Sequence, residues 1–211
     1  MDPVSASLEK FQKQFKKFKV NPKKRILCIL SESQHVESLA KLMRVEEWQP
    51  DNRSPFIILH TPYLDNQDEA AEEMCKQIRT QYEMLQKESL NDGVTLPPLT
   101  IEKADHKIPI DPVIEHVVAF DKCLKGRLEP SFFCWFPKNV KNVVKWKKAV
   151  RWFYDYLLEQ GNKIVLGNGI PKAFDDLFDD VIDQVDTIEY GYNQEASTDY
   201  FAKLFAAPSL G

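Results

Sequence analysis

Short apolar runs and longer amphipathic segments alternate along most of the chain. The apolar runs predict buried strands at residues 25–30, 56–60, 131–136 and 163–169. The longer segments carry an apolar residue every three or four positions, which predicts helices. We expect these helices at residues 34–48, 65–86, 111–126 and 142–160. Residues 94–110 contain three prolines and predict an edge strand or a loop.

The last part of the chain is less regular. Apolar residues between Phe174 and Ile188 follow helical spacing with aspartates between them, which predicts an acidic helix. Val185 and Ile188 can instead belong to a short strand that continues toward residue 192. A terminal helix is expected near residues 196–205.

The first segment predicts a basic amphipathic helix. Its apolar stripe contains Leu8, Phe11, Phe15 and Phe18, and lysines occupy the other faces. The stripe can dock on the rest of this chain, dock on another subunit, or lie on an anionic membrane surface. Docking is the commoner fate, and we expect the three phenylalanines to be contact residues for a partner.

The order of the elements predicts the fold class. Strands alternate with helices that are too long for hairpin connections, which favours a mostly parallel sheet with helices on both faces. We expect a three-layer Rossmann-like α/β/α fold with an added N-terminal helix. Residues 1–22 would form that helix and its linker, residues 23–206 a single α/β domain, and residues 207–211 a tail.

The turn after the first strand lacks the residues that bind phosphate. Nucleotide-binding folds place glycines at this crossing, but the first glycine of this chain is Gly93. Glu32 would put a negative charge at the positive end of the following helix, where a phosphate should lie. Ser31 and Ser33 are instead placed to cap that helix. The crossing therefore corresponds to a degenerate phosphate loop, and we expect no cofactor.

The same turn permits an alternative function as an enzyme or a nucleotide-responsive protein. Ser31 or Ser33 could act as a nucleophile and Glu32 could orient the base. His35 and His60 are the candidate bases, since both lie at predicted strand ends. No G-x-S-x-G motif supports this function.

Charge is unevenly distributed along a chain whose formal net charge is −4. Residues 1–25 and residues 138–151 are basic, whereas residues 171–190 are acidic. Such blocks can select partner proteins or engage one another between copies of the chain. The candidate contact residues in the later blocks are Lys145, Lys148, Arg151, Trp152, Asp176, Asp179 and Asp183.

Two further partners are compatible with the basic blocks. Lysines and aromatic residues interleave in residues 142–160, a pattern found in nucleic-acid-binding proteins. The negative net charge makes nucleic acid an unlikely partner, and a membrane surface is possible without being favoured.

Other chemistry has little support in the sequence. The four cysteines form no Cys-x-x-Cys pair and no zinc-type spacing, so we expect buried free thiols and no metal. No apolar run approaches the roughly 20 residues needed to span a bilayer, and the N-terminus is charged, so we expect a cytoplasmic protein.

The leading hypothesis is a non-enzymatic scaffold or adaptor module that binds other protein subunits or itself.

Overall fold

The protein contains one sheet of five parallel strands. A computed structural model describes residues 3–63, 66–102, 108–157, 159–170 and 172–191. The strands are β1 (Ile26–Leu30), β2 (Phe56–Leu59), β3 (Phe132–Trp135), β4 (Lys163–Asn168) and β5 (Val185–Glu189). Their order across the sheet is β2-β3-β4-β1-β5, and every pair is parallel.

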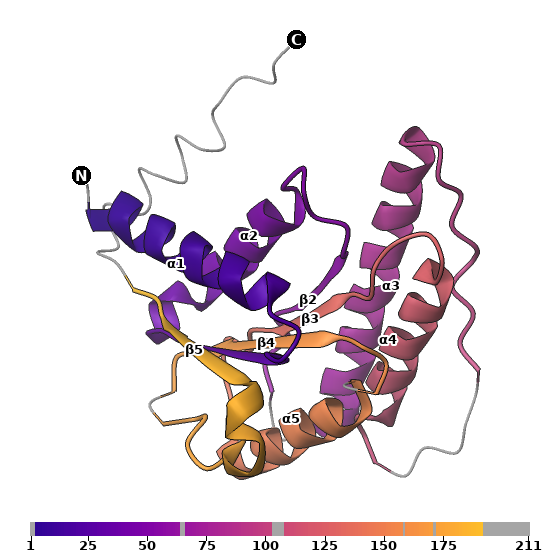
Figure 1. Cartoon of the computed structure of the whole chain (residues 1–211). Helices are drawn as coiled ribbons and strands as arrows, with labels where there is room; N and C mark the ends of the chain where they lie inside the picture. Colours follow the sequence, from indigo (N-terminus) through magenta and orange to yellow (C-terminus); the bar gives the residue numbers. More distant parts are fainter. Residues whose placement is uncertain (1–2, 64–65, 103–107, 158, 171, 192–211) are drawn as a thin grey trace.

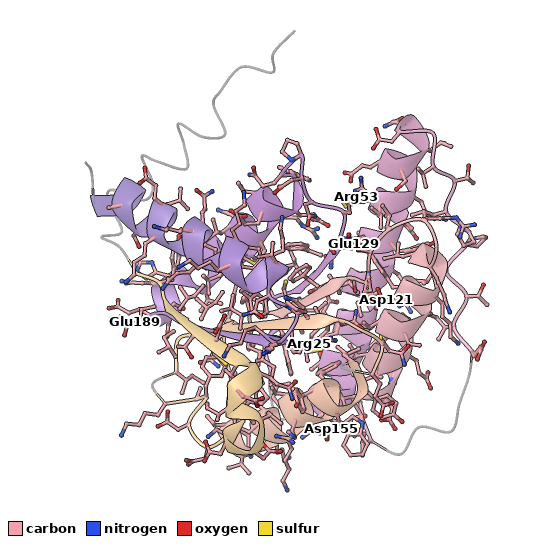
Figure 2. The ribbon with its side chains drawn as sticks, viewed as in Figure 1. Arg25, Arg53, Asp121, Glu129, Asp155 and Glu189 are labelled. Carbon is pink, nitrogen blue, oxygen red and sulfur yellow. The ribbon has the colours of Figure 1, made fainter. Side chains whose placement is uncertain are left out.

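Helices cover both faces of this sheet (Figure 1). On one face lie α1 (Pro3–Val20) and α2 (Val36–Glu47). On the opposite face lie α3 (Gln67–Asn91), α4 (Asp111–Leu124) and α5 (Val143–Leu157). Side chains fill the space between the layers (Figure 2). The expected three-layer Rossmann-like α/β/α fold with an N-terminal helix is confirmed.

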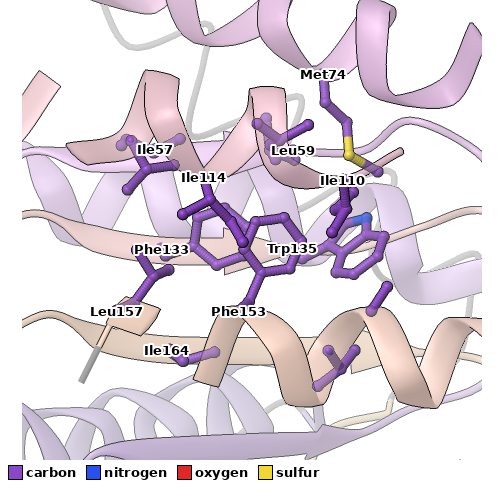
Figure 3. Packing of buried hydrophobic residues seen from close by; sticks show 14 of the residues in the cluster. Ile57, Leu59, Met74, Ile110, Ile114, Phe133, Trp135, Phe153, Leu157 and Ile164 are labelled. Carbon is purple, nitrogen blue, oxygen red and sulfur yellow. The ribbon is translucent and has the colours of Figure 1, made fainter. Parts of the chain in front are cut away.

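Because neighbouring residues of a strand point to opposite faces, the sheet supports two separate cores. Figure 3 shows part of the core under α3, α4 and α5, in which Phe133 and Trp135 of β3 meet Phe153 of α5. The Phe133 and Phe153 ring centroids are 4.5 Å apart. The sequences of the buried strands are continuous apolar runs because helices cover both faces of the sheet.

The three phenylalanines of α1 belong to the other core. Phe11, Phe15 and Phe18 are each 0% exposed. The Phe15 ring centroid lies 6.0 Å from those of Phe56 and Phe132. The stripe is therefore docked on the protein's own sheet, and the expectation that these rings contact a partner is corrected. The sheet of the same chain is always beside the helix, so docking of the phenylalanines on it is favoured over binding to a separate protein.

A lysine of the sheet holds the end of α1. Lys163 donates from Nζ to the carbonyl oxygens of Phe18, Lys19 and Asn21, at 2.5, 3.0 and 2.8 Å. The first two carbonyls lie in the last turn of the helix and the third lies directly after it, where the helix dipole favours a cation. The segment after α1 is thus tied to the first residue of β4.

The expected serine caps of α2 are not present. The helix begins at Val36 after a short 3-10 turn at Ser33–His35, and neither Glu32 nor His35 caps a helix start through its side chain. The Ser33 hydroxyl instead donates to the carbonyl of Gly169 at 3.2 Å. Tertiary contact with the loop after β4 has replaced the local bond that the spacing predicted.

The acidic segment is not the α-helix that its spacing predicts. It consists of turns and a six-residue 3-10 helix, Asp179–Gln184. Lys172 and Asp176 have φ angles of 59° and 58°, in the left-handed region that interrupts a right-handed helix. The strand alternative for Val185 and Ile188 is confirmed as β5. The predicted terminal helix and the tail lie outside the described residues.

Strand β2 forms one edge of the sheet, and side chains cover that edge. Gln81 of α3 accepts from the Ile58 N–H at 2.8 Å and donates to the Ile58 carbonyl at 2.9 Å. Glu47 of α2 accepts from the Phe56 N–H at 2.6 Å, and Gln77 accepts from the His60 N–H at 3.3 Å. These bonds occupy backbone groups that would otherwise accept a further strand.

We expect Gln81→Leu to lower the free energy of unfolding by about 1–3 kcal/mol, because it leaves both polar groups of Ile58 without a partner. Urea unfolding followed by circular dichroism would measure the loss. Gln77→Leu is the matched control, since Gln77 lies one turn away, is also half-buried, and makes only one, longer bond to the backbone of the strand edge. Equal losses in the two variants would contradict the role assigned to Gln81.

Candidate functional site

The carboxyl ends of β1 and β4 form the place where folds of this kind usually bind ligands. The chain leaves β1 toward α2 on one face, and it leaves β4 toward the opposite face, where Phe178 is buried. Ligands occupy the crevice between two such strands. Here Gly169 lies directly against Ser33: a Cβ atom on Gly169 would be 2.1 Å from the Ser33 Cα. Contact between the two loops closes the crevice.

The structure does not assemble the candidate catalytic cluster. Ser33 bonds to Gly169, Glu32 accepts from Gln34 at 2.7 Å, and His35 is only 2% exposed. Ser31 is half-buried, and its hydroxyl has no hydrogen-bond partner among the described residues.

The second candidate base, His60, follows β2, which is the edge strand on the opposite edge of the sheet from β1 and β5. β2 and β1 are three strand intervals apart, or about 14 Å. This separation keeps His60 out of hydrogen-bond reach of Ser31 and Ser33. The strand order therefore weakens the enzyme alternative, which needs a base beside one of the serines.

A second candidate site is a groove on the side of the sheet covered by α3, α4 and α5, which we call the α5 groove. Its volume is about 440 Å³. Its walls come from one face of α5, from Tyr63 after β2, and from the residues that lead into α4. The lining residues are Tyr63, Gln67, Ile108, Pro109, Ile110, Lys145, Lys148, Ala149, Arg151 and Trp152.

Local interactions fix the face that α5 presents to the groove. Asn142 caps the helix by accepting from the Lys145 N–H at 3.0 Å. Trp146 and Phe153 are 0% and 1% exposed and anchor the helix in the core. With those positions inward, Lys145, Lys148 and Trp152 lie at i, i+3 and i+7 on a neighbouring face. The predicted contact residues of this block are thus brought together.

The two lysines of the α5 groove are charged groups at its exposed rim. Lys145 and Lys148 are exposed, and neither has an ion pair within the described residues. No described acidic residue lines the groove, whereas Tyr63, Ile110 and Ala149 are buried at its base. The groove therefore combines an apolar base with a cationic rim.

Arg151 differs from the two lysines because it is held by acids of the same chain. It donates to both carboxylate oxygens of Asp180, at 2.6 and 2.5 Å, and lies 3.4 Å from Asp155. The bonds with Asp180 raise the pKa of Arg151 and lower the pKa of Asp180. Lys147 donates to the Asp175 carbonyl at 2.6 Å. The basic and acidic blocks thus meet within one chain, an arrangement that differs from the pairing between copies that the sequence also allowed.

Trp152 offers an oriented aromatic surface at the rim. Its indole N–H donates to Asp111 at 3.1 Å, and its ring centroid lies 6.3 Å from that of Tyr156. The side chain remains 39% exposed. A tryptophan held in this way can bind an apolar group with little loss of its own conformational freedom.

The remaining candidates lie elsewhere. Asp176, Asp179 and Asp183 are exposed on the segment before β5, with no ion pair among the described residues. Sequence reasoning missed Tyr63 and Ile110. No local pattern distinguishes them from core residues, and only the approach of three distant segments makes them part of a groove.

The cysteines behave as predicted. All four are free and buried. Burial raises the pKa of Cys28 to about 12 and that of Cys75 to about 11, which keeps both as unreactive thiols. The described residues contain no group of three or more His, Cys, Asp or Glu side chains that could hold a metal ion. Within the same residues, every helix is too short or too polar to cross a membrane.

The fold and its sites define a three-layer α/β protein with an all-parallel sheet, a closed crevice at the carboxyl ends of β1 and β4, and a basic groove beside α5. Comparisons of the chain with protein-family models, with curated proteins and with solved structures find no match. The functional argument therefore rests on the geometry of the groove.

Proposed function

We propose that the protein is a non-enzymatic interaction module, a scaffold or adaptor, that binds an acidic segment of a partner protein in the α5 groove. The observation that carries this proposal is the combination of an apolar base with Lys145, Lys148 and Trp152 at the rim. Acidic side chains of the partner would pair with the two lysines, and one large apolar side chain would enter beside Trp152.

The distribution of basic residues favours a protein partner over nucleic acid. Helix α1, which carries one block of lysines, lies over one face of the sheet, and α5, which carries the other block, lies over the opposite face (Figure 1). A nucleic-acid backbone requires a continuous positive track, and two blocks on opposite faces do not form one. The volume of the groove suits one or two side chains better than a strand of phosphates.

The packing of α1 argues against a membrane surface as partner. An amphipathic helix binds a bilayer through its apolar face, and the phenylalanines of that face are already in the core. Exposing them to lipid would require the helix to leave the sheet. The lysines that remain outside could contribute only electrostatic attraction.

A short fluorescent peptide of aspartates flanking a central phenylalanine tests the proposal by fluorescence anisotropy. We expect the protein to bind it, with an affinity that falls as salt rises because the lysines are exposed. Lys148→Glu should weaken binding by at least about tenfold, since it replaces an attraction with a repulsion. Trp152→Ala should also weaken binding without changing the salt dependence.

Lys147→Glu provides the matched control. It changes the net charge by the same amount from the adjacent position, but Lys147 does not line the groove and points to Asp175 instead. Failure of the unaltered protein to bind the peptide would contradict the proposal. So would equal weakening by Lys147→Glu and Lys148→Glu, which would show that only the overall charge matters.

A further inference from the structure

The two edge strands of the sheet, β2 and β5, differ in whether side chains bond to their outward-facing backbone groups. At β2, the side chains of Glu47, Gln77 and Gln81 bond to the outward-facing backbone groups. At the other edge, β5 pairs with β1 and, among the described residues, with no second strand. Figure 1 shows β5 as the outermost strand on its side of the sheet. Side chains thus cover the first edge, whereas no described segment covers the second, and an edge of this kind can accept a further strand.

The register identifies the backbone groups that are available. The Tyr190 N–H donates to the Leu30 carbonyl at 2.8 Å, and Cys28 is the register partner of Thr187. Because backbone direction alternates along a strand, Thr187 and Glu189 point their N–H and C=O groups away from β1. Within the described residues, no hydrogen bond joins these groups to another element.

The edge has a defined length. Lys24 donates from Nζ to the Val185 carbonyl at 2.7 Å and lies 3.3 Å from Asp186, so the start of β5 is covered. Thr187 and Glu189 have exposed side chains, and Figure 2 shows Glu189 on the outer side of the strand. The available edge therefore runs from Thr187 to Glu189, long enough for two pairs of strand hydrogen bonds.

We propose that the β5 edge accepts an extended basic segment of a partner protein as a sixth strand. Backbone bonds to Thr187 and Glu189 would supply the pairing, as in other cases of strand addition. The charge of the surroundings selects a basic segment. Glu189 on the strand and Asp179 and Asp183 on the segment that leads into it are exposed, with no ion pair among the described residues.

A second copy of the chain is a poorer occupant of the same edge. Pairing two β5 strands would bring the Asp183 and Glu189 carboxylates of both copies into one region, where they repel. A basic segment would meet the same carboxylates with attraction. This site differs from the α5 groove in its location and in the charge of its ligand, so its existence does not depend on the function proposed for the groove.

Two peptides of identical charge test the inference. The first is a short labelled peptide in which lysine alternates with threonine or valine, a pattern that favours an extended chain. The second has the same sequence with methyl groups on its central peptide nitrogens, which removes backbone donors from both of its edges. We expect the unaltered protein to bind the methylated peptide at least about tenfold more weakly.

A variant of the protein provides a second measurement. Thr187→Pro removes the outward N–H and places a ring where the added strand would lie. An edge strand tolerates proline at such a position because no bond within the sheet is lost. It should reduce binding of the first peptide at least about tenfold, whereas Thr187→Val should retain it. Thermal unfolding of both variants checks that the fold is intact.

Each other outcome would overturn the inference. Lack of binding by the first peptide would exclude a basic strand, and equal binding of the two peptides would show attraction by charge alone. Full binding by a folded Thr187→Pro variant would place the peptide elsewhere. Sedimentation of the unaltered protein as a dimer that Thr187→Pro dissociates would identify a second copy as the occupant. Lys148→Glu, which is expected to weaken binding in the α5 groove, should leave binding of the lysine-containing peptide unchanged.

Discussion

Replacing Phe15 with alanine is expected to lower the free energy of unfolding by about 3–5 kcal/mol. The ring is 0% exposed and packs between Phe11 and Phe18 of its own helix and Phe56 and Phe132 of the sheet. Alanine would remove these contacts and leave a cavity that the helix and the rigid sheet cannot fill. Urea unfolding followed by tryptophan fluorescence and circular dichroism would measure the change.

Trp48→Ala is the control for this prediction, because Trp48 is 65% exposed and its loss should change the stability by no more than about 0.5 kcal/mol. An unchanged stability in Phe15→Ala would mean that α1 does not pack on the sheet. In that case the phenylalanines would again be available to a partner or a membrane. The measurement thus decides between the intramolecular packing and the original expectation of an external contact.

Gly169→Ala is expected to cost about 1–3 kcal/mol of stability. The added methyl group would lie 2.1 Å from the Ser33 Cα and 2.3 Å from the Ser33 nitrogen. Both neighbours are backbone atoms, so a rotamer change cannot relieve the clash, and the two loops must separate. Thermal and urea unfolding would both report the loss.

The matched substitution is Gly191→Ala, for which the added methyl group meets no atom within 4 Å. It should leave stability nearly unchanged. If the two variants were equally stable, Gly169 would not be in contact with Ser33 and the crevice would be open. The crevice would then have room for a ligand, and the enzyme alternative would regain support.

The sequence predicted most elements because their signals are local. A buried strand such as β3 is a run of apolar residues, and α4 begins at an Asp-Pro pair, and both were located to within one or two residues. The acidic segment was misjudged because helical spacing does not reveal a left-handed φ angle at Lys172 or Asp176. The segment instead contacts α5, through Lys147 and Arg151, and such tertiary contacts are not encoded in the spacing.

In the candidate sites too, some features follow from local sequence and others from the packing of distant segments. Lys145, Lys148 and Trp152 share a face because helix geometry alone places them there, and the sequence predicted that grouping. Tyr63 and Ile110 join them only when distant segments pack together. Ser31 and His60 both follow strands, but their separation depends on the order of strands in the sheet, which a pattern along the chain does not contain.

The sequence by itself determined the alternation of strands and helices, the parallel three-layer architecture and the faces on which charge accumulates. These properties follow from the periodicity of each segment and from the order of the segments along the chain, and they need no knowledge of tertiary contacts. Only the tertiary structure decided that the phenylalanines of α1 are internal, that Ser33 contacts Gly169, and that side chains cover the edge of β2, whereas no described segment pairs with the outer edge of β5. Each of these outcomes is a contact between segments far apart in the chain, and such contacts are selected by the packing of the whole molecule.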